Sequence, residues 1–380
     1  MIRSERARGL LYQVVLLAAV GGAAWYLFTN TLNNLESRHI QVGFGFLSRE
    51  AGFEIAEKLI EYDSTRNYAR ALAVGLFNTL YVAFLGIVIA TVLGTFIGIA
   101  RLSSNWLVAR IASGYVEFMR NIPLLLQLFV WYGLFTELLP GVRQAIKVGD
   151  WIFISQRGFR FAWPESHPAW DAALWALLVG IVLALAWRAM VRRRQAATGQ
   201  QWPLAWPSLV CIIGLPALVW AAMGAPTAIQ IPVLRGFDYQ GGRVISPEFM
   251  ALLLGLSTYT AAFIAEVVRA GILAVDRGQT EAAMALGLSP HQRLRLVTLP
   301  QALRVIIPPI TSQYLNLTKN SSLAVAIGYP DLVAIANTTM NQTGQAIEAI
   351  AILMAVYLSI SLSISLFMNW YNARVRLVER

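Results

Sequence analysis

Residues 71–100 read ALAVGLFNTLYVAFLGIVIATVLGTFIGIA, thirty residues without a charged side chain. A helix of about 20 apolar residues already crosses the roughly 30 Å hydrocarbon core of a bilayer. The stretch therefore predicts a membrane-spanning helix whose ends tilt or project beyond the core. The whole chain is 57% hydrophobic and 13% charged, which is about half the charge usual in soluble proteins. We therefore expect an integral membrane protein.

Further apolar segments extend this pattern to about eight spanning helices, so the expected fold class is an all-α membrane protein. The predicted spans cover residues 10–28, 71–100, 115–139, 172–190, 206–223, 247–266, 305–327 and 348–368. Three arginines precede the first span, as in a signal peptide, but its apolar run is too long for one, and we expect a retained anchor.

Basic residues predict the orientation. Arg188 and the run Arg192–Arg194 follow the fourth span, whereas residues 328–345 contain no lysine or arginine. Because cytoplasmic loops carry an excess of basic residues, we expect residues 188–205 and both termini in the cytoplasm. The formal net charge of +10 then belongs to these loops and does not indicate nucleic-acid binding.

The remaining segments give weaker signals. Residues 29–70 are charged, and the spacing of Ile55, Leu59 and Ile60 predicts an amphipathic helix on the outer surface. Residues 140–171 and 224–246 show no clear period. The single cysteine, Cys211, excludes an intrachain disulfide, and three scattered histidines do not predict a metal site.

One polar stretch, EAAMALGLSP at residues 281–290, predicts its own shape. Good helix formers run up to Gly287, which tolerates the left-handed conformation common at helix ends. Ser289 can cap a second helix, with Pro290 in its first turn and Gln292 completing a capping box. We expect two short helices meeting at Gly287, the second ending near Leu299 and Pro300.

The spacing E-A-A-x3-G-x9-V-x-L-P, from Glu281 to Pro300, resembles the signature loop of permease subunits of bacterial ABC importers. Val297 stands where that family usually has isoleucine. Further segments resemble the polar amino-acid branch of the family: NTL at 78–80, ARL at 100–102, EFMRNIPLLLQ at 117–127, AEVVRAGI at 265–272 and KNSSL at 319–323.

The resemblance covers about 71–139 and 247–373 and implies a five-helix permease core. The chain would divide into an anchor helix with an outer-surface segment (1–70), the first part of the core (71–139), an insertion with two extra spans (140–246), and the second part of the core (247–373). The last part would include a cytoplasmic coupling loop at 269–304. Such an enlarged chain looks like one of the two permeases of general L-amino-acid importers.

By this resemblance the chain is a multi-pass subunit of an ATP-driven L-amino-acid importer in the bacterial inner membrane. Its implied partners are a cytoplasmic ABC ATPase dimer, a periplasmic amino-acid-binding protein, the lipid bilayer and a second permease, with a heterodimer favoured over a homodimer. The sequence has no G-x-x-x-x-G-K-[ST] phosphate loop, so ATP and Mg²⁺ are assigned to the partner ATPase and no cofactor to this chain. The implied coupling residues are Glu281, Ala282, Ala283, Gly287, Ser289, Pro290, Leu299 and Pro300.

Polar residues inside the seventh span predict a substrate path, because ionisable groups are costly in a membrane. Lys319 lies about 16 Å along a helix from Pro308, near mid-membrane. The candidate path residues are Asn316, Thr318, Lys319, Asn320, Ser321 and Ser322. The alternative is structural: Lys319 would pair with Asp331 or Glu348, and the hydroxyls would join helices.

Two i,i+3 spacings, Glu117 with Arg120 and Glu266 with Arg269, predict ion pairs with a structural or gating role. Gly94 and Gly98 form a G-x-x-x-G pair, which favours helix packing over a pathway.

A stand-alone transporter and a membrane-embedded enzyme are the alternatives to the importer. A stand-alone secondary transporter or channel would need its own coupling-ion site and often paired interrupted helices, and it leaves the 281–300 spacing unexplained. A membrane-embedded enzyme lacks a catalytic constellation in this sequence.

Overall fold

The computed structural model describes residues 5–37 and 43–375. The predicted positions of the two chain ends, 1–4 and 376–380, lie outside the described residues. The helices are α1 Glu5–Ser37, α2 Tyr68–Ala100, α3 Trp106–Asn121, α4 Leu124–Glu137, α5 Pro168–Thr198, α6 Ala205–Leu209, α7 Leu215–Ala222, α8 Pro247–Leu273, α9 Arg277–Ala285, α10 Pro290–Arg293, α11 Leu299–Asn320, α12 Leu332–Thr343 and α13 Ala346–Val375. The strands are β1 Ile146–Val148, β2 Ile152–Ser155, β3 Gly158–Phe161, β4 Trp163–Pro164, β5 Ile229–Gln230, β6 Val233–Arg235, β7 Asp238–Gln240 and β8 Arg243–Ile245.

Contacts divide the chain into two compact units. The first unit combines Met1–Tyr132 with Glu248–Arg380, and the second is Gly133–Pro247. The second unit encloses residues 140–246, the segment predicted to be an insertion into a permease core. The status of residues 140–246 as an insertion stays a prediction.

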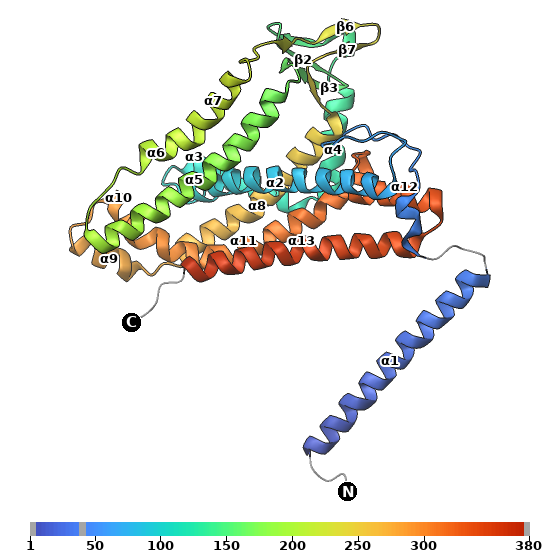
Figure 1. Cartoon of the computed structure of the whole chain (residues 1–380). Coiled ribbons are helices and arrows are strands. Elements are labelled where there is room, and N and C mark those ends of the chain that lie inside the picture. Colours follow the sequence, from blue (N-terminus) through green and yellow to red (C-terminus); the bar gives the residue numbers. More distant parts are fainter. Residues whose placement is uncertain (1–4, 38–42, 376–380) are drawn as a thin grey trace. The chain divides into compact units, whose positions relative to one another are not determined.

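In the first unit, long helices pack side by side. α2 contacts α11 and α12, and α13 contacts α11 (Figure 1). The G-x-x-x-G pair of α2 lies against α8: a Cβ added at Gly94 would sit 2.7 Å from the Cβ of Ile264, and one at Gly98 would sit 2.7 Å from the carbonyl oxygen of Ala265. The predicted packing role of these glycines is confirmed, since only glycine permits so close an approach.

Six described helices are long and apolar enough to cross a membrane, or up to eight crossings exist if two bent helix pairs each count as one. The predicted single helix over 115–139 is wrong. It is split into α3 and α4, which meet at an angle of 106°. Ile122 is extended at φ −102° and ψ 129°, the conformation that a following proline favours, and Pro123 therefore ends α3.

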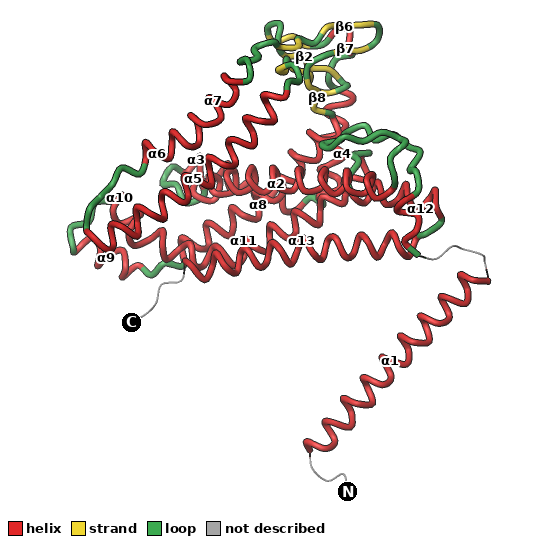
Figure 2. The backbone as a smooth tube through the Cα atoms, viewed as in Figure 1, coloured by secondary structure: helices red, strands yellow, loops and turns green. Residues whose placement is uncertain are grey.

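The second unit holds a helical hairpin and short strands. α5 packs against α7, and a Cβ at Gly180 would sit 2.0 Å from the carbonyl oxygen of Cys211, so the two chain segments approach closely. The strands β1, β2, β3 and β8 form one antiparallel sheet in that order, and two further strand pairs lie beside them in yellow in Figure 2. The all-α expectation missed these strands because runs of two to four residues are too short to show an alternating pattern.

The outer segment before α2 is not the predicted amphipathic helix. Residues 49–67 are extended or turned, and Phe44–Ser48 is one 3₁₀ turn. Phe46 and Ile55 are buried in a cluster with Leu332 of α12, whereas Leu59 is 42% exposed. Tertiary packing thus buries Phe46 and Ile55 and leaves Leu59 exposed, and it overrides the local helical spacing.

Candidate functional site

The loop between α8 and α11 has the predicted helix, corner and helix. α9 ends at Ala285, Gly287 is left-handed at φ +72°, and α10 begins at Pro290. The backbone N–H of Gln292 donates to Ser289 Oγ at 3.4 Å, and the backbone N–H of Ser289 donates to Gln292 Oε1 at 3.0 Å. This reciprocal pair confirms the predicted capping box.

The same loop exposes large apolar side chains. Met284 is 50% exposed, Leu286 80% and Leu296 62%. Of the predicted coupling residues, Glu281 and Ala282 are also exposed, whereas Ala283 is buried. Apolar side chains clustered on an otherwise polar loop are typical of a surface that contacts another protein.

The second helix of this loop does not end near Leu299 and Pro300. It continues through a π-turn at Leu294–Thr298 into α11. A proline inside a regular α-helix removes one hydrogen bond and crowds the preceding turn, and here the wider π-turn directly precedes Pro300. The exposed corner is therefore joined to the seventh predicted span by one continuous helix.

The predicted path residues lie in α11 and in the 3₁₀ helix Ser321–Ile327 that follows it, and they differ in exposure. Asn316 and Lys319 are exposed, together with Ser312 one turn before them, so they form a stripe at helical spacing. Thr318 and Ser321 are buried, and their hydroxyls donate to the carbonyl oxygens of Tyr314 at 2.8 Å and of Thr318 at 2.7 Å. The half-buried residues are Asn320 and Ser322. The structure thus brings Asn316 and Lys319 together on one surface and turns Thr318 and Ser321 away from it.

Lys319 does not form either predicted ion pair. Asp331 Oδ1 accepts the N–H of Ala334 at 2.8 Å as the N-cap of α12. Glu348 Oε1 accepts the N–H of Gly43 at 2.6 Å. Among the described parts of the chain no salt bridge includes Lys319. Its ammonium group is therefore available on the exposed stripe.

Glu266 of α8 is the centre of a charged cluster. Arg269 donates to it at 2.6 Å, as the i,i+3 spacing predicts, and Arg101 at the end of α2 also donates to it. Arg120 Nη1 lies 3.9 Å from the same carboxylate. The predicted Glu117–Arg120 pair is wrong, because Arg120 approaches Glu266 and Glu117 stays exposed without a salt bridge among the described residues. One carboxylate thus joins α2, α3 and α8.

Two residues of α2 have roles that the sequence pattern missed. Asn78 Nδ2 donates to the carbonyl oxygens of Glu57 at 2.8 Å and Pro330 at 2.9 Å. Thr79 Oγ1 accepts the N–H of Leu332 at 3.1 Å. The available signal was the presence of two adjacent polar residues in an apolar span, since a buried polar group needs a partner.

A family model described as "Binding-protein-dependent transport system inner membrane component" matches residues 204–377. The chain is 49% identical to the general L-amino acid transport system permease protein AapQ of Rhizobium johnstonii, over 98% of this chain and 93% of that protein. It is 52% identical to the putative amino-acid ABC transporter permease protein YhdX of Escherichia coli, over 98% and 95%. It is 42% identical to the glutamate/glutamine/aspartate/asparagine transport system permease protein BztB of Rhodobacter capsulatus, over 100% and 96%. The similarity therefore includes residues 140–246.

Proposed function

This chain belongs to the amino-acid ABC transporter permeases, and from that premise we propose which of its residues conduct substrate and which receive the ATPase. As a member of this family it is a transport subunit, and ATP hydrolysis belongs to a separate subunit. An ATPase and a substrate-binding protein are its partners in transport.

The cargo proposed for this permease is a range of L-amino acids, and the membrane is the bacterial inner membrane. The support is the sequence identity of 49% and 52% to two relatives whose names describe general L-amino acid and amino-acid transport. We pair this chain with a second, different permease, as its resemblance to one of the two permeases of general L-amino-acid importers implies. The binding protein would then deliver substrate on the periplasmic side.

The exposed stripe of α11 is proposed to line the substrate path. The observation that carries this proposal is the exposed Lys319, which forms no salt bridge among the described residues. It lies in the segment Pro290–Ile327, which together with α12 forms a bent pair, at 53°, that is long and apolar enough to cross a membrane. Its ammonium group and the amide of Asn316 match the carboxylate that every amino acid carries. Thr318 and Ser321, which face inward, would support the helix and not contact substrate.

Uptake by a Lys319→Met variant tests this role. A hydrogen bond to a charged group contributes about 1.5–3 kcal/mol, so we expect uptake of labelled amino acid by the reconstituted complex to fall roughly tenfold or more. Lys319→Arg, which keeps the charge, is the matched control and should retain a larger share of the uptake. Full uptake with unchanged specificity in a normally expressed Lys319→Met complex would contradict the proposal.

The corner at Gly287 is proposed to dock in a groove of the ATPase. Its support is the exposed apolar surface of Met284 and Leu286 next to a rigidly capped second helix. ATP and Mg²⁺ would bind only to that partner. Closure of the ATPase subunits would move α9 and α10, and the continuous helix would transmit this movement to the stripe.

A further inference from the structure

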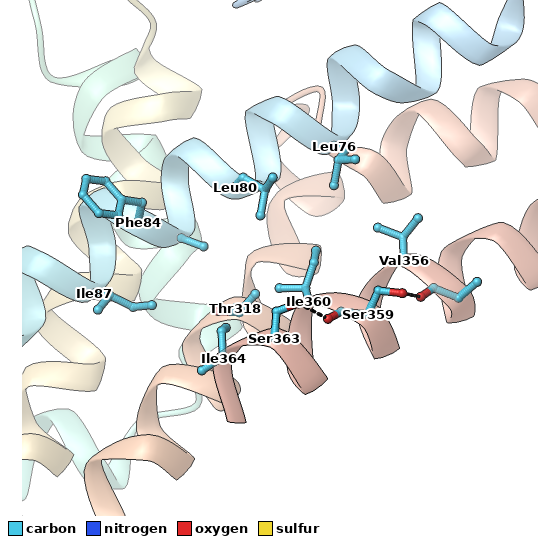
Figure 3. A pocket seen from close by; sticks show the side chains of 12 residues that line it. Leu76, Leu80, Phe84, Ile87, Thr318, Val356, Ser359, Ile360, Ser363 and Ile364 are labelled. Carbon is cyan, nitrogen blue, oxygen red and sulfur yellow. Dashed lines mark hydrogen bonds between the residues drawn. The ribbon is translucent and has the colours of Figure 1, made fainter. Parts of the chain in front are cut away.

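The first unit has an apolar groove between two of its long helices. The groove has a volume of about 590 Å³ and opens between α2 and α13, with Thr318 of α11 at its floor (Figure 3). Leu80 and Phe84 form one wall, and Ser359 and Ser363 belong to the other. An apolar groove of this kind in a membrane protein is filled either by lipid or by another helix.

The wall formed by α13 combines a row of small residues with Val356, Ile360 and Ile364. Ala355, Ser359 and Ser363 line the groove at four-residue intervals. The Ser359 hydroxyl donates to the carbonyl oxygen of Ala355 at 2.7 Å, and the Ser363 hydroxyl donates to that of Ser359 at 2.8 Å, as the dashed lines in Figure 3 show. Small residues with internally satisfied hydroxyls allow a second helix backbone to approach closely in lipid, where apolar contact alone gives no preference for protein over lipid.

α1 has matching properties. None of its apolar window Gly9–Thr31 is buried, and its middle contains the small run Gly21, Gly22, Ala23, Ala24. A Cβ placed at Gly21 or Gly22 would meet no atom within 4 Å. α1 is thus long and apolar enough to span a membrane and is narrow on every side at the level of Gly21–Ala24, and the described contacts give this narrow level no partner.

The connection after α1 holds its end close to the groove. The N–H of Gly43 donates to Glu348 in the first turn of α13, and only five residues separate Ser37 from Gly43. The end of α1 must therefore lie within about 20 Å of Gly43, which itself contacts the first turn of α13. If α1 folds back along α13, the depth of Ala355–Ser363, about 14–26 Å from Ala346, corresponds to residues 20–28 of α1, which include the small run.

We propose that α1 packs antiparallel to α13 in the groove between α2 and α13, with the run Gly21–Ala24 against Ser359 and Ser363. This packing fills the groove above the already buried Thr318 and closes the lipid-facing side of α11 next to the proposed path. α1 is then an integral part of the permease fold, in addition to anchoring the chain.

Disulfide trapping in the complete transporter complex tests this packing. Cys211→Ala first removes the only thiol of the chain. Each of Gly21, Gly22, Ala23 and Ala24 is then replaced by cysteine in combination with Ser359→Cys, so that the four positions sample every direction around α1. A disulfide forms only when the Cα atoms lie about 4.4–6.8 Å apart, and the linked peptides are identified by mass spectrometry.

The expected result is an intrachain disulfide at one or two of the four positions, several-fold above the yield with Leu358→Cys. Leu358 is the matched control because it is 60% exposed and does not line the groove. The same four cysteine positions of α1 are also combined with Ser363→Cys, so that the conclusion does not depend on Ser359 alone. Disulfides only between different chains, or no disulfide at any position of an assembled complex, would overturn the proposal in favour of another subunit or lipid.

Discussion

Glu57, in the outer segment before α2, is held in an unfavourable environment for a carboxylate. Burial, with a smaller effect of the Glu248 charge, raises the pKa of the Glu57 carboxyl from 4.5 to about 7. Its Oε1 is buried without a hydrogen-bond partner in the described structure. The protonated form is therefore the one that the fold favours.

The stability of the complex should depend on this proton. The pKa of Glu57 is higher in the folded protein than in the unfolded chain. Protonated Glu57 therefore gives its full stabilisation below pH 4.5, and this stabilisation is lost as the pH rises to about 7. The loss in the free energy of unfolding is on the order of 3 kcal/mol. Glu57→Gln should remove this loss, so the variant should gain thermal stability over the wild type between pH 5 and pH 8. Thermal unfolding of the detergent-solubilised complex at both pH values measures the difference.

Glu54→Gln is the control for that comparison, because the Glu54 side chain is 67% exposed in the same segment. It should leave the pH dependence unchanged. If the unfolding temperatures of Glu57→Gln and the wild type change with pH in the same way, the Glu57 carboxylate does not destabilise the fold.

Residue roles were predictable where the interaction is local. The cap formed by Ser289 and Gln292 follows from a spacing of three residues and was confirmed. The environment of Lys319 was not predictable, because it depends on where Asp331 and Glu348 find partners along the chain. Those partners, Ala334 and Gly43, are set by a helix cap and by a distant segment.

At the scale of elements, the corner between α9 and α10 depends on the backbone of Gly287. An added Cβ would meet no atom within 4 Å, so a substitution acts through the positive φ and not through a clash inside this chain. Left-handed backbone costs most residues about 1–2 kcal/mol, and asparagine tolerates it better. We expect Gly287→Val to insert into the membrane normally and to abolish binding-protein-stimulated ATP hydrolysis in proteoliposomes.

Gly287→Asn separates the two possible requirements at that position. Retained hydrolysis in this variant would show that the corner needs its backbone conformation, whereas a loss equal to that of Gly287→Val would show that the ATPase excludes any side chain there. Normal stimulated hydrolysis in Gly287→Val would remove the corner from the coupling mechanism.

The packing of α2 on α8 gives a second prediction for elements. In Gly98→Ala the new methyl group would lie 2.7 Å from the Ala265 carbonyl oxygen, and overpacking of this kind costs about 1–3 kcal/mol. Thermal unfolding should therefore occur at a lower temperature. Gly114→Ala makes the same change on α3, where nothing lies within 4 Å, and should have little effect. Equal unfolding temperatures for Gly98→Ala and Gly114→Ala would contradict the close packing of α2 against α8 at Gly98.

Most helices of this chain could be located from apolar length, but their interruptions could not. Pro123 was visible in the sequence, yet a proline inside a spanning segment either kinks or breaks a helix, and packing decides between these outcomes. Pro300 shows the opposite case, since the helix continues through it after a π-turn. The strands of the second unit pair across up to 86 residues, as Phe159 does with Ile245, and no local pattern encodes such pairing.

At the scale of the whole molecule, the charge distribution predicts the sidedness of the second unit. The arginines 192–194 lie near the end of α5, and β6 and β7 lie beyond the end of α7. The positive-inside rule places the first group in the cytoplasm and the strands on the outer side.

Cysteine labelling checks this arrangement. In a Cys211→Ala background, Phe237→Cys at the tip of the β6–β7 hairpin, 78% exposed, should react with a membrane-impermeant maleimide in spheroplasts. Gln200→Cys, in the exposed loop after α5, should react only after permeabilisation. The reverse labelling pattern would invert the topology of the whole chain.

The continuous helix from Pro290 to Ile327 has a mechanical consequence. Ser289 and Lys319 are separated by thirty residues, or about 45 Å of helix. If the segment moves as one body, a tilt of about 10° around one end displaces the other end by about 8 Å, more than the rise of one helical turn. On the proposed function, a small rotation imposed at the corner by the ATPase would therefore shift the ammonium group of Lys319 by more than the rise of one helical turn.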